Sequence, residues 1–126
     1  AEAARRPAPG EWSVKEVIGH VVDAERVFAY RCICVARGEK QTLPGFDQDD
    51  YVANADFNAR SLASLLDEFD LLRRANLLAM TALAPAVLDR HGAISSYHQS
   101  VRAFFYVMAG HAQHHILSLR QDYGLA

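Results

Sequence analysis

A group of histidines near the carboxyl end of the chain has the residue type and spacing of a metal site. Residues 110–115 read Gly-His-Ala-Gln-His-His. His111 and His115 are four residues apart, and in a helix this spacing places two side chains on one side, one turn apart. Two imidazoles in that relation can bind one divalent ion. The alternative is a pair of core histidines, each satisfied by its own hydrogen bond.

A helical wheel shows which of these histidines face the protein interior. At 100° per residue, five apolar positions fall within about 40° of one line: Val101, Phe105, Met108, Ala112 and Leu119. His111 and His115 lie about 80° and 40° from that line, on or beside the apolar face. His114 lies about 140° from it and points away. The segment therefore contains one inward pair of histidines.

A third ligand must come from another part of the chain. His20 is the strongest candidate, because it lies beside Ala24 and Val27 at the edge of an apolar stripe and can face a neighbouring helix. His91 and His98 fall in a segment without helical periodicity, where we expect histidines exposed to solvent.

Acidic residues offer a supporting role at such a site. Glu25 lies within about 20° of the line through Val14 and Cys32, on an apolar face where a carboxylate needs a partner. It could orient a ligand imidazole, bind the metal directly or act as a general base. The alternative is a buried ion pair with an arginine. An acidic cluster at Asp47, Asp49 and Asp50 could supply oxygen ligands, although three acids in a loop are most often solvated.

Three long amphipathic segments must position these residues. Ser-Val-Lys-Glu at 13–16 has the form of a capping box, and helical spacing continues from there until Gly38. A second helix is predicted from about 56 to 83, ended by Pro85, and a third from about 101 to 122, capped by Ser100. Residues 39–55 are predicted to form a long loop and residues 84–99 an irregular connection, with no strand. The fold class is all-α.

Composition restricts the class of protein. The 126 residues carry 13 Lys and Arg against 15 Asp and Glu, a formal net charge of −2, and 51% are hydrophobic. This balance is typical of one globular domain, here residues 1–126, and lacks the basic excess that nucleic-acid binding requires. No apolar run suits a membrane span or a signal peptide, so we expect a cytoplasmic protein without a membrane partner. Cys32 and Cys34 cannot bridge each other in a helix and are expected to be reduced.

Four stretches of the sequence together resemble the DinB-like superfamily of metal-dependent enzymes, which shares a four-helix bundle with YfiT-type proteins. They are Arg-Pro-Ala-Pro-Gly-Glu-Trp-Ser-Val-Lys-Glu-Val-Ile-Gly-His, Asp-Ala-Glu-Arg-Val-Phe-Ala-Tyr-Arg, Leu-Pro-Gly-Phe-Asp and Ala-Gly-His-Ala-Gln-His-His. The resemblance runs from Arg6 to Leu125. It implies an up-and-down four-helix bundle and a metal site formed by His20, His111 and His115.

The resemblance also implies a helix before the Pro-Gly-Glu-Trp-Ser segment, where only about one or two turns fit in this chain. We therefore expect either a truncated first helix or a gap closed by the partner subunit of a homodimer. Three neutral imidazoles suit zinc or nickel first, with iron, cobalt and manganese as alternatives. They leave coordination positions open, as catalytic rather than structural sites do.

Three functions follow as hypotheses. By resemblance, the first is a metal-dependent transferase in which a low-molecular-weight thiol, such as bacillithiol or mycothiol, attacks a small-molecule electrophile. The loop at 39–55 would then shape the substrate pocket. The second is a metal-dependent hydrolase, with Glu25 or an acid from 47–50 as general base. The third is a non-catalytic, stress-related metal-binding domain, whose site would be sealed by Phe104, Tyr106 or loop side chains.

Overall fold

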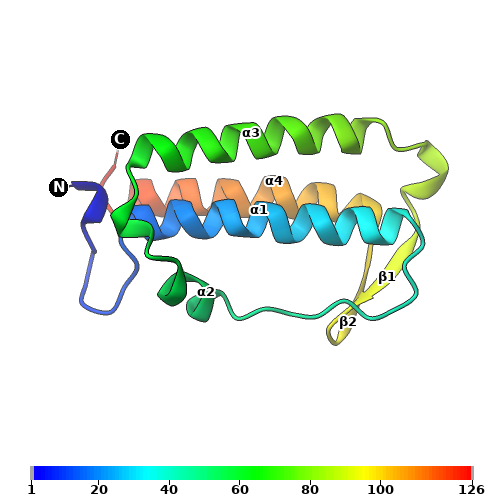
Figure 1. Cartoon of the computed structure of the whole chain (residues 1–126), viewed down its shortest axis with the longest axis horizontal. Coiled ribbons are helices and arrows are strands. Elements are labelled where there is room, and N and C mark those ends of the chain that lie inside the picture. The colour runs from blue at the N-terminus through cyan, green and yellow to red at the C-terminus, as the bar shows by residue number, and fades with distance from the viewer. Residues whose placement is uncertain (1, 126) are drawn as a thin grey trace.

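Three long helices form the body of the molecule. The computed structural model describes residues 2–125, and its long helices are α1 (Val14–Ala36), α3 (Leu62–Thr81) and α4 (Val101–Gln121). They lie side by side along the length of the molecule, and α1 packs against both of the others (Figure 1). A short fourth helix, α2 (Gln48–Ala55), lies beside α1. The prediction of an all-α fold of the four-helix-bundle type is confirmed.

The direction of the helices depends on the segment that connects α1 to α3. This segment turns back after α1 and runs along that helix before α3 begins, so that α1 and α3 point the same way and α4 points the opposite way (Figure 1). The returning segment, which contains α2, occupies the place in the chain that a long antiparallel helix between α1 and α3 would have. Among residues 2–13, which precede α1, the structure shows one 3-10 turn, at Glu2–Ala4.

The start of α1 follows the predicted capping box. Ser13 Oγ accepts a hydrogen bond from the backbone N–H of Glu16 at 3.1 Å, and Glu16 Oε1 accepts one from the backbone N–H of Ser13 at 2.9 Å. Ser13 Oγ also donates to Asn58 Oδ1 at 2.7 Å, which ties the start of α1 to the segment before α3. Gly38 follows the helix with a positive φ of 82°, a backbone conformation that glycine adopts without strain. The prediction for α1 is confirmed.

The prediction of an unstructured loop over 39–55 is wrong in its second half, where α2 forms. Asp47 caps this helix, because its Oδ1 accepts from the backbone N–H groups of Asp49 and Asp50 at 3.0 and 3.1 Å. The second long helix also begins later than predicted. Asp56 has a positive φ of 53°, a 3-10 turn follows at Phe57–Ala59, and Ser61 then caps α3.

The prediction of an irregular, strand-free connection over 84–99 is also wrong. The antiparallel strands β1 (His91–Ile94) and β2 (Tyr97–Ser100) form a hairpin in which Ile94 faces Tyr97. Each strand has four residues, too few for an alternating pattern to stand out in the sequence. The buried Ile94 and a bridge from Leu43 anchor the hairpin to the rest of the fold.

Two apolar clusters lie at opposite ends of α1. The larger surrounds its carboxyl end and includes Cys32, Val35, Met80, Ile94, Val101, Phe104 and Met108. The other lies at its amino end and contains Val14, Val17, Leu119 and Tyr123. His20 and Glu25 are buried on α1 between these clusters, so the middle of the bundle contains polar groups beside its apolar side chains.

Gly19 of α1 allows the segment before α3 to approach this helix closely. Gly19 lies against the ring of Phe57, which packs so closely that a Cβ at position 19 would overlap the ring. This contact holds the 3-10 turn before α3 against the helix that carries His20. None of the helices over residues 2–125 combines the length with the apolar character that a membrane span needs.

Candidate metal centre

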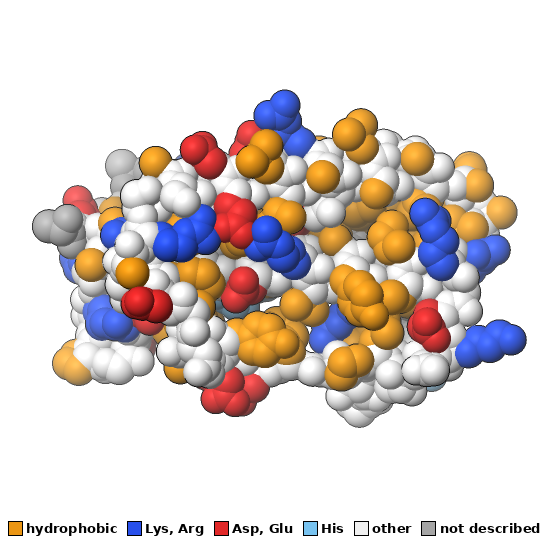
Figure 2. Space-filling view, viewed as in Figure 1, with side chains coloured by type: hydrophobic (Ala, Val, Ile, Leu, Met, Phe, Trp, Pro, Cys, Tyr) orange, Lys and Arg blue, Asp and Glu red, His pale blue; other side chains and the backbone are white. Residues whose placement is uncertain are grey.

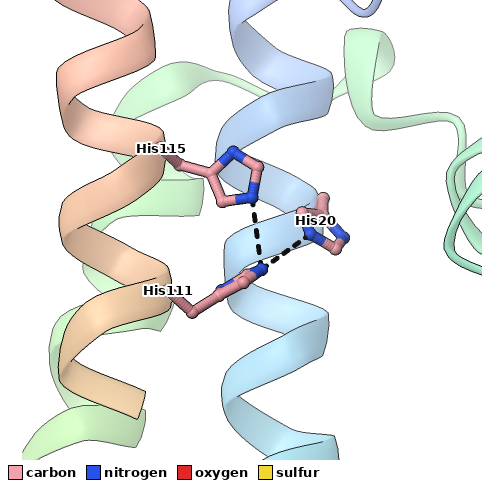
Figure 3. Close-up of side chains that lie close together, drawn as sticks. All are labelled: His20, His111 and His115. Carbon is pink, nitrogen blue, oxygen red and sulfur yellow. Dashed lines mark hydrogen bonds between the residues drawn. The ribbon is translucent and has the colours of Figure 1, made fainter. Parts of the chain in front are cut away.

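Three histidines from two helices converge inside the bundle. His20 comes from α1, and His111 and His115 come from successive turns of α4 (Figure 3). The Nε2 atom of His111 lies 3.0 Å from Nε2 of His20 and 3.2 Å from Nε2 of His115. One ligand nitrogen from each residue lies within 4.8 Å of the others. The structure therefore brings together the three histidines that the sequence singled out.

This geometry is better suited to a cation than to hydrogen bonds. Each nitrogen of a neutral imidazole carries either a proton or a lone pair. The His111 nitrogen therefore cannot form a full hydrogen bond with both of its neighbours at once. Three lone pairs directed at one ion satisfy all three rings. Nitrogens bound tetrahedrally at about 2.0–2.1 Å from zinc are about 3.3 Å apart, close to the two short distances seen here. The donor set fits a divalent ion.

The electrostatic environment keeps these histidines neutral. Burial, with a smaller contribution from the neighbouring His111 and His115, lowers the pKa of His20 from 6.5 to about 4. Burial, together with the neighbouring His111 and His114, likewise lowers the pKa of His115 to about 4. The pKa of His111 is lowered by burial and by His114, while the negative charge of Glu25 opposes the shift. Neutral imidazole is the form that binds a metal.

Aromatic side chains account for much of this burial. The ring of Trp12, which precedes the α1 cap, lies 4.9 Å from the His20 ring between centroids. The Phe28 ring lies 5.3 Å from that of His111, edge to face. Tyr123 Oη donates to the backbone carbonyl of Trp12 at 2.6 Å and so fixes the position of the tryptophan from the end of the chain. The sequence did not single out Trp12, and its position beside the His20 ring was not predicted.

Glu25 forms the arginine ion pair that was the alternative interpretation of its sequence position. Its two oxygens accept from Arg73 Nε and Nη2 at 2.9 and 3.0 Å, and Asn76 Nδ2 donates to it at 2.9 Å. Arg73 Nη2 also donates to the carbonyl of Met108, three residues before His111, at 3.3 Å. The pair therefore connects α1, α3 and α4 beside the histidines. The ion pair with Arg73 occupies both oxygens of Glu25. The role of Glu25 as a general base stays a prediction.

The other histidines and the cysteines are not part of this cluster. His114, His91 and His98 are exposed, as the sequence predicted. Cys32 and Cys34 are free, and burial raises the pKa of the Cys32 thiol to about 11, which disfavours its nucleophilic thiolate.

A cavity of about 580 Å³ opens beside the histidine centre. His115 and His114 lie in its wall, together with Trp12 and residues of the segment before α1. Apart from the two histidines, the residues of its wall that are charged at neutral pH are acidic: Glu11, Asp49 and Asp122. Of the acidic cluster predicted as a source of oxygen ligands, Asp47 caps α2 and Asp49 lines this cavity. Phe104 is buried and Tyr106 is exposed, and neither lines the cavity.

Fold and site define a helical protein with a three-histidine centre beside an open cavity. The sequence matches the DinB superfamily over residues 1–119, and the chain belongs to that superfamily. Among solved structures it is similar to YfiT from Bacillus subtilis, which is described as a probable metal-dependent hydrolase with an unusual four-helix bundle topology. The two chains share 16% identity with a TM-score of 0.78, over 99% of this chain and 74% of YfiT. No curated protein matches the sequence.

Proposed function

We propose that the protein is a metal-dependent enzyme whose ion is held by His20, His111 and His115, and that its reaction is hydrolysis of a small molecule. The observation that carries the proposal is the convergence of three Nε2 atoms from α1 and α4. The description of YfiT as a probable metal-dependent hydrolase supports it. A divalent ion held there, zinc or nickel first, then iron, cobalt or manganese, would supply a Lewis acid that lowers the pKa of a bound water or thiol.

The cavity beside His115 supplies the residues for the remaining steps. Asp49 lines it and is exposed, so its carboxylate can accept a proton from an attacking water. Trp12 forms an apolar wall against which a substrate can pack. The volume of about 580 Å³ suits a small molecule. Hydrolysis needs a base near the open side of the site. Asp49 shares the cavity wall with His115 and is the candidate for this role, whereas the oxygens of Glu25 are occupied by Arg73 and Asn76.

Transfer of a low-molecular-weight thiol is the second candidate reaction. Three neutral ligands leave the full charge of a divalent ion uncompensated, which favours a thiolate as well as hydroxide in an open position. The lining of the cavity is acidic, and a thiol that carries carboxylates would meet repulsion there. We therefore place hydrolysis first.

A non-catalytic metal-binding domain is the third candidate. It would be favoured by a centre closed to small molecules. The cavity reaches His115, and neither Phe104 nor Tyr106 closes it. This supports an enzyme.

The metal proposal is tested by elemental analysis. The full chain is purified without a metal-affinity column, and the wild type is compared with His111→Ala and with His98→Ala, an exposed histidine of the hairpin. We expect about one divalent ion per chain in the wild type and in His98→Ala, and a large loss in His111→Ala. Equal metal content in all three proteins would show that His111 is not a ligand and would overturn the proposed metal site.

The reaction is tested with the metal-loaded protein on a panel of esters, amides and related hydrolysable substrates, with and without low-molecular-weight thiols and model electrophiles. We expect hydrolysis that falls about 10²–10⁴-fold in Asp49→Asn while metal content is unchanged. Asp50→Asn is the matched control, because Asp50 is a neighbouring exposed acid that does not line the cavity. Conjugation without hydrolysis would favour thiol transfer. The absence of both activities would favour the non-catalytic metal-binding domain.

We also propose that the protein forms a homodimer and acts in the cytoplasm, as the sequence led us to expect. Large apolar side chains are exposed on α3 and α4, and an apolar groove lies between these helices. Exposed apolar surface of this kind is typical of interaction sites. The exposed residues include Leu66, Leu71, Leu77, Leu78, Ile116 and Leu117. Light scattering on the purified chain measures the oligomeric state.

A further inference from the structure

One buried charge has not been accounted for by the metal centre. In the described part of the chain, the buried polar or charged residues are Ser13, His20, Glu25 and Arg31. The first three are bonded to polar side chains, as given above. Arg31, on α1, is only 6% exposed, and its hydrogen bond within the chain runs from Nη2 to the carbonyl of Pro44 at 2.9 Å. Among residues 2–125, no carboxylate lies within 4 Å of it.

The two buried charged residues of α1 therefore have different kinds of partner. Glu25 has a cation, Arg73, on its two oxygens, whereas Arg31 has a neutral carbonyl. A guanidinium remains charged in proteins and presents five N–H donors in a planar fork. Buried charges are normally paired, because removal from water is costly without an opposite charge. The Arg31 nitrogens that bond no group of the chain are not fully enclosed, so their N–H donors can bond an anion that enters from outside.

Arg31 lines a small cavity on the face that the returning segment covers. The cavity has a volume of about 290 Å³ and lies between α1 and residues 43–51. The Arg31 guanidinium carbon lies 5.6 Å from the centroid of the Phe46 ring, and Phe46 in turn packs against Tyr51. Hydrophobic side chains gather on this face along the segment below α1 (Figure 2). The cavity thus combines two arginines with a mostly apolar wall.

The second arginine of this cavity is already neutralised. Arg26 is exposed at its rim and forms an ion pair with Glu68 of α3. One free positive charge remains, that of Arg31. A single guanidinium fork matches the two oxygens of a carboxylate. The aromatic wall favours an organic acid over an inorganic anion, because the apolar body of the acid is buried on binding.

This cavity is separate from the metal centre. Arg31 follows His20 by eleven residues, about three turns of helix, so the two lie on the same side of α1 about 16 Å apart along its axis. The cavity also shares no lining residue with the cavity beside His115. Ligand binding at Arg31 therefore does not depend on the proposed metal or reaction.

The geometry points to a second small-molecule site, in which Arg31 binds the carboxylate of a small organic acid whose apolar body packs against Phe46 and Tyr51. The probe is 3-phenylpropionate, titrated into the full chain and followed by the shifts of backbone amide NMR signals. Its neutral amide, 3-phenylpropanamide, has the same shape without the charge. We expect the acid to bind about tenfold to hundredfold more tightly than the amide, with shifts at residues 43–51.

Variants separate this site from the rest of the surface. Arg31→Met is expected to lose about tenfold to hundredfold in affinity for the acid, and Arg31→Lys to lose less, since it keeps the charge but not the fork. Arg74→Met is the matched control, because it removes the same charge from an exposed position on α3. His111→Ala should bind the acid as the wild type does.

The acid and the amide can be compared on the wild type alone, so the test holds even if Arg31→Met does not fold. Equal affinity for acid and amide would overturn the proposal, and so would the absence of acid binding at millimolar concentration. Acid binding that survives in a folded Arg31→Met, or is lost in His111→Ala, would place the anion elsewhere and also overturn it.

Discussion

Replacing Arg73 with methionine tests the buried ion pair beside the histidine centre. The Glu25 side chain is 2% exposed, whereas that of Arg73 is 28% exposed. After Arg73→Met, the carboxylate keeps the hydrogen bond from Asn76 but has no cation. Removal of one partner from a buried pair costs about 3–5 kcal/mol. We expect Arg73→Met to lower the free energy of unfolding by an amount in this range.

The reverse substitution should cost less, because the two partners differ in exposure. Glu25→Gln leaves a guanidinium that reaches water, so we expect a loss of roughly 1–3 kcal/mol. The double variant Glu25→Met/Arg73→Met removes both charges and fills similar volume with apolar atoms. It should lie within about 1 kcal/mol of the wild type, since a buried ion pair can often be replaced by hydrophobic residues at little cost.

Urea unfolding of the metal-free protein in the presence of a chelator measures these differences, provided that the slope of the transition is unchanged between variants. A second readout is metal affinity by competition with a chelator. Arg73 also bonds the Met108 carbonyl on α4, so its loss should weaken metal binding about tenfold without removing a ligand. The reasoning fails if Arg73→Met costs less than about 1 kcal/mol, or if the double variant is less stable than either single one.

Three further predictions concern stability. Burial lowers the pKa of His20 and His115 from 6.5 to about 4, so the metal-free folded chain binds fewer protons than the unfolded chain between these values. Its free energy of unfolding should therefore fall as pH is lowered from 6.5 to 4, less steeply in His115→Asn; equal slopes by urea unfolding would contradict this. Gly19→Ala should destabilise by about 1–3 kcal/mol through overlap with Phe57, despite the better helix propensity of alanine, and a higher melting temperature would refute the packing argument. Ser13→Ala should cost about 1 kcal/mol by loss of the α1 cap, measured by the same unfolding assay, with no loss as the opposing result.

The features that sequence predicted well are encoded by residues close together in the chain. Ser13 and Glu16 specify the start of α1, and Ser100 specifies the start of α4, because caps are local hydrogen bonds. The inward direction of His111 and His115 follows from helical periodicity alone. Periodicity within that helix does not identify the third histidine. His20 was singled out because it lies at the edge of an apolar stripe on another helix.

The features that sequence missed depend on contacts between distant segments. The hairpin at 91–100 is stabilised by the burial of Ile94 and by its bridge to Leu43, which no local pattern reveals. Arg31 and Arg73 resemble any other surface arginine in the sequence. Arg31 becomes buried because the returning segment folds over α1, and Arg73 becomes paired because α3 brings it to Glu25. The Asp47 cap of α2 was a local signal that could have been found.

The arrangement of the core explains how the bundle can carry a costly polar layer. Apolar clusters lie on α1 on either side of His20 and Glu25, so packing at both ends holds the helices together independently of the residues between them. A site of neutral imidazoles can then be kept in a metal-binding geometry by the fold, with Trp12 packed against the His20 ring and Phe28 against the His111 ring. Metal is accordingly not needed to form the bundle, and its binding adds stability by mass action, about 4 kcal/mol at a concentration of 1,000 times the Kd. A centre formed in this way can leave open the coordination positions that catalysis requires.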